Sequence, residues 1–175
     1  ATVTYILNRG HSSYGGSTIT QQLIKNLKDD KSDSGLAGIQ RKIREMSRAY
    51  KVEKMLSKDQ ILELYLNTIF VGGEGNLHGV ELASRYYFNK SVGELDLAES
   101  AFLAGINHAP NSYNPFNGSD NSELIKKRTK TVLAEMKDLG KITEEEYNNA
   151  KAEVDEGLKF EKGNTATNSS MSYLA

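Results

Sequence analysis

Apolar residues recur every three or four positions along most of the chain, and no stretch alternates apolar and polar residues long enough to require a sheet. This spacing is typical of amphipathic helices that share one core. Glycines at 72, 73 and 75 interrupt the pattern and predict an irregular loop before the apolar segment 80–88. The predicted helical segments are 1–8, 17–28, 36 or 39 to 56, 58–70, 97–106, 121–139 and a short last one from 143.

Capping signals support several of these boundaries. A hydroxyl or carboxylate residue followed three positions later by Glu or Gln can form a capping box, in which each side chain bonds the other's backbone amide. Gly140 suits the end of the helix over 121–139. The helix over 97–106 is rich in small residues, which favours close packing inside a bundle. The expected capping boxes pair Ser57 with Gln60, Asp96 with Glu99, and Thr143 with Glu146.

Composition narrows the possible partners. The 175 residues are 38% hydrophobic, which allows one domain with a sizeable core. With 22 basic and 23 acidic residues the net charge is −1, so no overall field favours nucleic acid. The chain has no cysteine, and no apolar run reaches the length of a membrane span. Because 163–170 is polar and linker-like, we expect a domain over 1–156 and a linker over 157–175.

The segment from Gly15 to Asn26 carries the strongest chemical signal. Two glycines lead into a helix that Ser17 is expected to cap, and such a helix start favours an anion through its free amides and dipole. Lys25 adds a mobile ammonium to this side of the helix. The alternative is an ordinary amphipathic helix with a solvated polar face. The polar positions are Thr18, Gln21, Gln22 and Lys25, and the positions expected to face the core are Ile19, Leu23, Ile24 and Leu27.

Glu45 stands out because its carboxylate falls on an apolar helix face. On a helical wheel it aligns with Ala49, Val52 and Leu56, so it is expected to point inward. Arg41 lies four residues before it, and the alternative is therefore a weak surface ion pair between the two.

Other candidate sites are set aside. The glycines at 72–75 follow a helix and have the wrong spacing for a dinucleotide fingerprint. The basic residues 126–128 point in different directions on a helix and are interpreted as a solvated surface. The three histidines, His11, His78 and His108, share no metal-ligand spacing, so no metal site is predicted from them.

Several ordered blocks resemble the peptidoglycan glycosyltransferase family, the glycan-polymerising domains of class A penicillin-binding proteins and monofunctional glycosyltransferases. The block GGSTITQQ, followed by Lys25 and Asn26, resembles the second signature block of the family. The next matching block is RKIRE over 41–45, with Ala49 and Glu53. The resemblance continues to residue 116 through Ser57–Asn67, Gly79–Val80, Tyr87–Phe88, Leu97–Gly105 and Ala109–Pro115.

The resemblance implies an all-α, lysozyme-like glycosyltransferase domain that joins lipid II to a growing glycan chain. It implies that Glu45 is the second essential acid, near the donor's pyrophosphate, acting through basic residues or a divalent cation. It also implies a location at the outer face of the cytoplasmic membrane, possible contacts with other cell-wall synthesis proteins, and a transpeptidase domain beyond the linker. No cofactor is obligatory, although Mg²⁺ or Mn²⁺ at the diphosphate is compatible. Lys25 is the expected diphosphate ligand, with Gly16, Ser17, Gln21, Gln22, Arg41 and Lys42 around the same group.

One departure from the family pattern affects the expected activity. The family's first block, which carries the glutamate taken to be the general base, should lie before Gly15, yet residues 1–14 contain no Asp or Glu. We therefore expect that the chain as given does not polymerise glycan. Two alternatives stay open: a lysozyme-like glycan hydrolase or lytic enzyme, and a non-catalytic domain that binds a lipid diphosphate.

Overall fold

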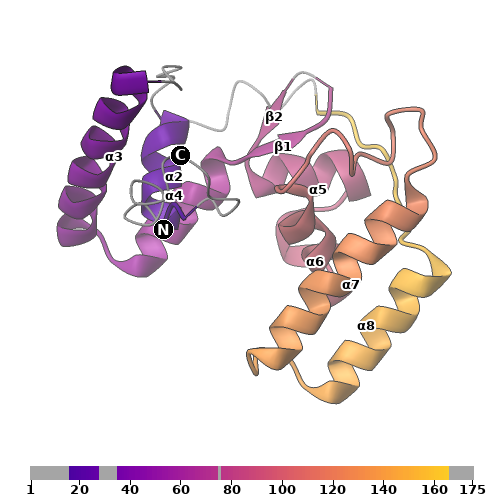
Figure 1. Ribbon diagram of the computed structural model, residues 1–175. Helices are drawn as coiled ribbons and strands as arrows, with labels where there is room; N and C mark the ends of the chain where they lie inside the picture. Colours follow the sequence, from indigo (N-terminus) through magenta and orange to yellow (C-terminus); the bar gives the residue numbers. More distant parts are fainter. Residues whose placement is uncertain (1–15, 28–34, 75, 166–175) are drawn as a thin grey trace. The chain divides into compact units, whose positions relative to one another are not determined.

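The computed structural model describes residues 16–27, 35–74 and 76–165, and helices dominate these ranges (Figure 1). The predicted all-α class is confirmed. The helix predicted for 1–8 lies outside the described residues. The helices are α2 Ile19–Leu27, α3 Gly35–Met55, α4 Lys58–Thr68, α5 Val80–Phe88, α6 Leu97–Ile106, α7 Ser122–Asp138 and α8 Glu144–Glu156, with a 3₁₀ turn at Val92–Glu94.

A small hairpin follows α4. Strand β1 (Phe70–Gly72) pairs antiparallel with β2 (Leu77–His78), so the prediction that α4 continues through Phe70 is wrong. Strands of this length are too short to show an alternating pattern in the sequence. Glycine is required at the turn, since Gly73 has a φ of 80° and a Cβ there would lie 2.8 Å from Leu77 Cδ1.

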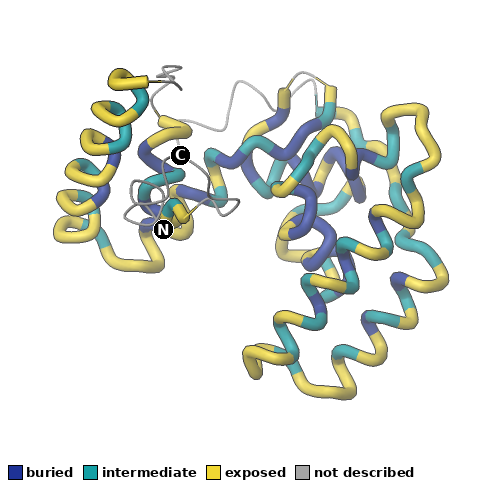
Figure 2. The backbone as a smooth tube through the Cα atoms, in the orientation of Figure 1, coloured by how far each residue is buried: buried dark blue, intermediate teal, exposed yellow. Residues whose placement is uncertain are grey.

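The chain divides into two compact units, 1–68 and 69–175. In the first unit α2 packs against both α3 and α4. Its buried stripe is Thr20, Leu23 and Ile24. Ile19 and Leu27 were expected to face the core but are exposed, because they stand at the two ends of a nine-residue helix whose middle alone is covered. The other buried residues of this unit's helices are Glu45, Ala49, Ile61 and Tyr65. Figure 2 draws buried positions in dark blue and shows that much of α3 is exposed.

In the second unit α6 packs against α7, α8 and α5. Its small residues Ala98 and Ala101 lie fully inside a cluster with Leu133 of α7 and Val154 of α8, which confirms the close packing predicted for this helix. A side chain at Gly105 would lie 3.1 Å from Arg128 Cγ, so the absence of a Cβ allows α7 to approach here.

The predicted helix boundaries agree with the structure at the caps. The capping boxes at Asp96 and Thr143 both form, and Ser57 and Gln60 exchange their two hydrogen bonds at 2.9 and 3.2 Å. Gly140 follows α7 with a φ of 65°, as expected for a residue that closes a helix. These boundaries are local features, so four-residue patterns were enough to find them.

A carboxyl cluster joins α6 and α8. Lys90 Nζ donates to Glu99 Oε1 at 2.6 Å, and Glu99 is almost fully buried. The pKa of Glu153 on α8 is raised mainly by burial, and further by the neighbouring Asp96 and Glu99 carboxylates. The ionisation of Glu153 therefore opposes folding.

Residues 157–163, which fall in the predicted linker, run back along α5. The amides of Glu161 and Gly163 donate to the carbonyls of Tyr87 and Tyr86 at 3.0 and 3.2 Å, so they satisfy acceptors in the last turn of the helix. The Phe160 ring stacks on Phe88 with centroids 5.4 Å apart. This part of the segment is packed, while the division of the chain at 156 stays a prediction.

Candidate active site

Helix α3 carries Glu45 on its buried face. Glu45 and Ala49 are each 4% exposed, and Val52 and Leu56 are half-buried, so the predicted inward stripe is confirmed. A carboxylate this deeply buried needs partners, because removing a charge from water without compensation is costly. The alternative of a solvated surface ion pair does not describe this position.

Two cations compensate the Glu45 carboxylate. Arg41 Nη1 donates to Oε1, and Lys42 Nζ donates to Oε2 at 3.1 Å. The Arg41 and Lys42 side chains are 14% and 26% exposed, so part of each cation stays accessible. One carboxylate and two cations leave a local charge of +1, which favours an anion at the open side of the cluster.

Lys42 connects this cluster to α2. Its Nζ donates to Ser17 Oγ at 2.5 Å, across 25 positions of sequence. The prediction that Ser17 caps α2 is wrong, since the amide of Gln21 donates to Thr18 Oγ1 at 3.2 Å instead. Thr18 is the residue immediately before α2, so its hydroxyl is placed for the cap. The Ser17 hydroxyl is consequently part of the cationic cluster.

The two glutamines of α2 differ in their surroundings. Gln22 Oε1 accepts from Tyr65 Oη of α4 at 3.3 Å. Gln21 Oε1 is buried and accepts no hydrogen bond from the residues that the structure describes. A buried acceptor without a donor is costly, so a ligand hydroxyl or amide at Gln21 would remove that cost.

The remaining predicted ligands lie at the edges. Gly16 is exposed and directly precedes Ser17. Lys25 is exposed in the last turn of α2, about 9 Å along the axis from its first residue, and no described hydrogen bond joins it to Glu45. The structure therefore brings together Ser17, Arg41, Lys42 and Glu45 by direct contact. The catalytic role of Glu45 and the binding roles of all the other residues stay predictions.

The described residues do not fit a resident Mg²⁺ or Mn²⁺. Within 16–27, 35–74 and 76–165 no three or more His, Cys, Asp or Glu side chains gather as metal ligands. Both Glu45 oxygens already accept from cations, and a divalent ion would have to displace one of them. The arrangement favours a protein-supplied cationic wall over a metal at this carboxylate.

Sequence reasoning missed two contacts of α2. A buried phenol hydroxyl usually finds a partner, and that rule applied to Tyr65 could have prompted a search for Gln22. Thr20 Oγ1 donates to Glu53 Oε1 of α3 at 2.7 Å, and no local pattern connects these positions.

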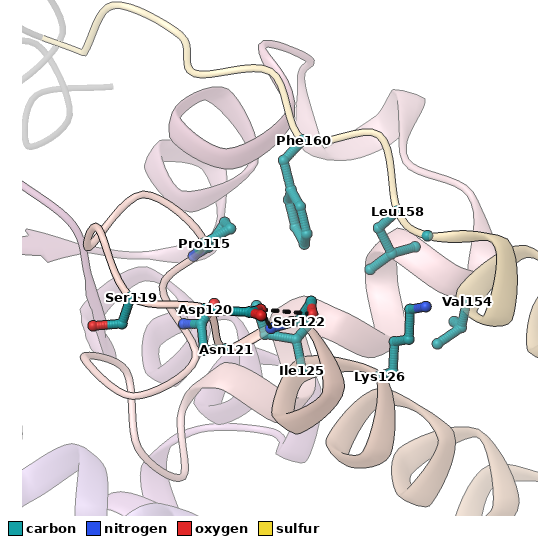
Figure 3. Close-up of a pocket in the computed structure, with 11 residues that line it drawn as sticks. Pro115, Ser119, Asp120, Asn121, Ser122, Ile125, Lys126, Val154, Leu158 and Phe160 are labelled. Carbon is teal, nitrogen blue, oxygen red and sulfur yellow. Dashed lines mark hydrogen bonds between the residues drawn. The ribbon is translucent and has the colours of Figure 1, made fainter.

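The second unit contains a cavity of about 250 Å³ that the sequence did not suggest (Figure 3). Ile125, Val154, Leu158 and Phe160 give it apolar walls. Its one carboxylate, Asp120, accepts from Ser122 Oγ at 2.9 Å. The cation that lines this cavity, Lys126, donates to the Asp155 carbonyl oxygen at 3.0 Å. Because Asp120 has no second acid beside it in the lining, we keep the Glu45 cluster as the candidate active site.

Comparison with known proteins identifies the family. The family model described as Transglycosylase matches residues 1–137. The chain belongs to the transglycosylase family. Penicillin-binding protein 1A of Clostridium botulinum (strain Langeland) is 44% identical over 169 residues, covering 95% of this chain and 20% of that protein. Penicillin-binding protein 1A of Escherichia coli K12 is 40% identical over 147 residues, covering 83% of this chain and 16% of that protein.

A solved structure supports the fold of this transglycosylase. The crystal structure of penicillin-binding protein 1A from Haemophilus influenzae matches with a TM-score of 0.52 and 37% identity, over 61% of this chain and 15% of that chain. The predicted glycosyltransferase-type helical fold is thereby confirmed. The chain spans about a fifth or less of the length of these relatives. Every helix in the described ranges is too short or too polar to cross a bilayer.

Proposed function

We propose that this transglycosylase domain, within its full-length protein, polymerises lipid II into β-1,4-linked glycan strands with release of polyprenyl diphosphate. The observation that supports this most directly is the Glu45 cluster, which places an excess positive charge beside the N-terminal end of α2. A diphosphate leaving group gains charge as the glycosidic bond breaks. Fixed cations aimed at that charge lower the barrier.

In this mechanism the acceptor's sugar hydroxyl gives its proton to the general base that the family resemblance places before Gly15. Its oxygen bonds the anomeric carbon of the growing chain as the bond from that carbon to the lipid diphosphate breaks. A single displacement inverts the configuration at that carbon. Glu45 holds the Arg41 guanidinium and the Lys42 ammonium, and the Ser17 hydroxyl fixes the second of these. We do not assign Glu45 as the base that deprotonates the acceptor, because both of its carboxylate oxygens already accept hydrogen bonds from Arg41 and Lys42.

The substrate sets the expected surroundings of the protein. Lipid II and the growing glycan carry polyprenyl chains, so the domain is proposed to work at the outer face of the cytoplasmic membrane. Other cell-wall synthesis proteins are the proposed partners there, and nucleic acid is not. The near-zero net charge of the chain agrees with a site whose positive charge is local.

The test is polymerisation of lipid II in detergent by the full-length protein, followed by gel separation of the glycan strands. We expect strands from the wild type and a strong loss in Lys42→Ala. Cleavage of finished peptidoglycan without polymerisation would instead favour a hydrolase. Lipid II binding with no polymer under any condition would favour a binding domain.

A further inference from the structure

The hydrogen bond between Thr20 and Glu53 stands apart from the ligand groups of α2. Thr20 lies in the first turn of α2 and is 5% exposed, and its hydroxyl donates to Glu53 Oε1 at 2.7 Å across 33 positions of sequence. A hydroxyl bound to a carboxylate at this distance is a strong, charge-assisted hydrogen bond. Ordinary capping does not explain it, because the α2 cap is Thr18.

Apolar packing alone does not set how α2 is rotated about its axis. Leu23 and Ile24 are buried against the neighbouring helices, but burial is non-directional and tolerates small rotations. A hydrogen bond weakens steeply when its angle changes. The bond between Thr20 and Glu53 therefore selects one orientation of α2 relative to α3.

Other polar links of α2 use residues that are proposed to meet the ligand. Ser17 accepts from Lys42, and Gln22 accepts from Tyr65. A bound diphosphate or sugar can exchange with these bonds. Neither Thr20 nor Glu53 belongs to the proposed ligand set, so their bond can persist when the ligand arrives.

We propose that Glu53 is a positioning residue that holds α2 through Thr20 and so aims the Ser17 to Gln22 face at the substrate. Glu53 follows the buried Glu45 by eight positions of α3, about 80° round the helix. Glu53 is exposed, but its carboxylate accepts from the buried Thr20 hydroxyl. One helix thus carries both the carboxylate that gathers the cations and the carboxylate that orients the opposing helix. This inference rests on the proposed polymerase function.

The test compares variants of the full-length protein in three measurements: lipid II polymerisation, binding of the phosphoglycolipid inhibitor moenomycin, and thermal unfolding. Thr20→Val keeps the shape of the side chain and removes the hydroxyl, and Glu53→Ala removes the acceptor. We expect each to lower kcat/KM by about tenfold to 100-fold, the range that a small misplacement of catalytic groups can cost. Thr20→Ser and Glu53→Gln, which keep a donor and an acceptor, should recover most of the rate.

A double variant separates positioning from a general structural effect. If the two side chains act through one bond, Thr20→Val combined with Glu53→Ala should be no worse than the poorer single variant. The control is Glu135→Ala. Glu135 is exposed near the end of α7, as Glu53 is near the end of α3. This variant should keep wild-type kinetics and unfolding temperature.

Three results would overturn the inference. The first is wild-type kcat/KM in Glu53→Ala while Lys42→Ala is inactive. The second is an additive loss in the double variant. The third is a loss in Glu53→Ala that only follows unfolding, with Glu53→Gln equally affected. Failure of the wild type to polymerise or bind lipid II would instead reject the polymerase function, so the two failures are distinguishable.

Discussion

Replacement of Glu45 by Gln tests the centre of the proposed site. The change keeps the size of the side chain and removes its charge. Glu45 is 4% exposed and holds Arg41 and Lys42, so the variant leaves two cations without their counter-charge. We expect the cations to repel each other and turn toward water, which removes the arrangement that would stabilise a departing diphosphate.

The expected loss of activity exceeds the expected loss of stability. Loss of one fixed electrostatic group aimed at a developing charge costs about 100-fold to 1,000-fold in rate, which is roughly 2.7–4 kcal/mol of barrier. The free energy of unfolding should fall by about 1–3 kcal/mol, the cost of losing hydrogen bonds to a charged group. The exposed fractions of Arg41 and Lys42, 14% and 26%, allow water to replace part of the lost interaction. A domain of ordinary stability tolerates such a loss and stays folded.

The assay is polymerisation of lipid II by the full-length protein, with circular dichroism melting of the same samples and Glu135→Gln as a matched control. Because Glu45 is proposed to act by holding Lys42, Glu45→Gln combined with Lys42→Ala should lose little more than the worse single variant. Near-normal glycan synthesis by Glu45→Gln in a folded sample would refute the reasoning.

Three further predictions use other parts of the chain. Lys25→Ala should weaken binding of moenomycin or lipid II, with partial recovery in Lys25→Arg, because a planar guanidinium does not replace a compact ammonium; unchanged titrations would show that Lys25 is only solvated. Glu153→Gln should raise Tm by a few degrees at pH 7, because the pKa of Glu153 is raised in the folded state and its ionisation opposes folding above that pKa. The gain in Tm should shrink as pH falls through that pKa. A pH-independent gain would contradict this cause. Gly163→Ala should lower Tm by several degrees, because its Cβ would lie 2.1 Å from the Arg85 carbonyl oxygen. The control Gly93→Ala should leave Tm unchanged, because a Cβ there meets no atom within 4 Å. Equal effects of the two variants would argue against the packing of residues 157–163 on α5.

The features that the sequence determined by itself are local. The capping boxes at Asp96 and Thr143 depend on side chains and amides three residues apart, so the pattern was sufficient. The inward face of Glu45 follows from helical geometry, because positions 45 and 49 must lie on one side of any helix that contains both. The blocks from Gly15 onward indicated the family for the same reason, since they are contiguous strings.

The tertiary structure alone decided which helices meet and through which atoms. Ser17 was expected to cap its own helix, yet its hydroxyl accepts from Lys42, and Thr20 bonds Glu53 on the same neighbouring helix. Such partners are 25 and 33 positions apart, and their pairing depends on how α2 crosses α3. Helical periodicity states which side of a helix is apolar but not which helix covers it or at what angle. For that reason the sequence could nominate the residues of the site, while packing decided which of them touch.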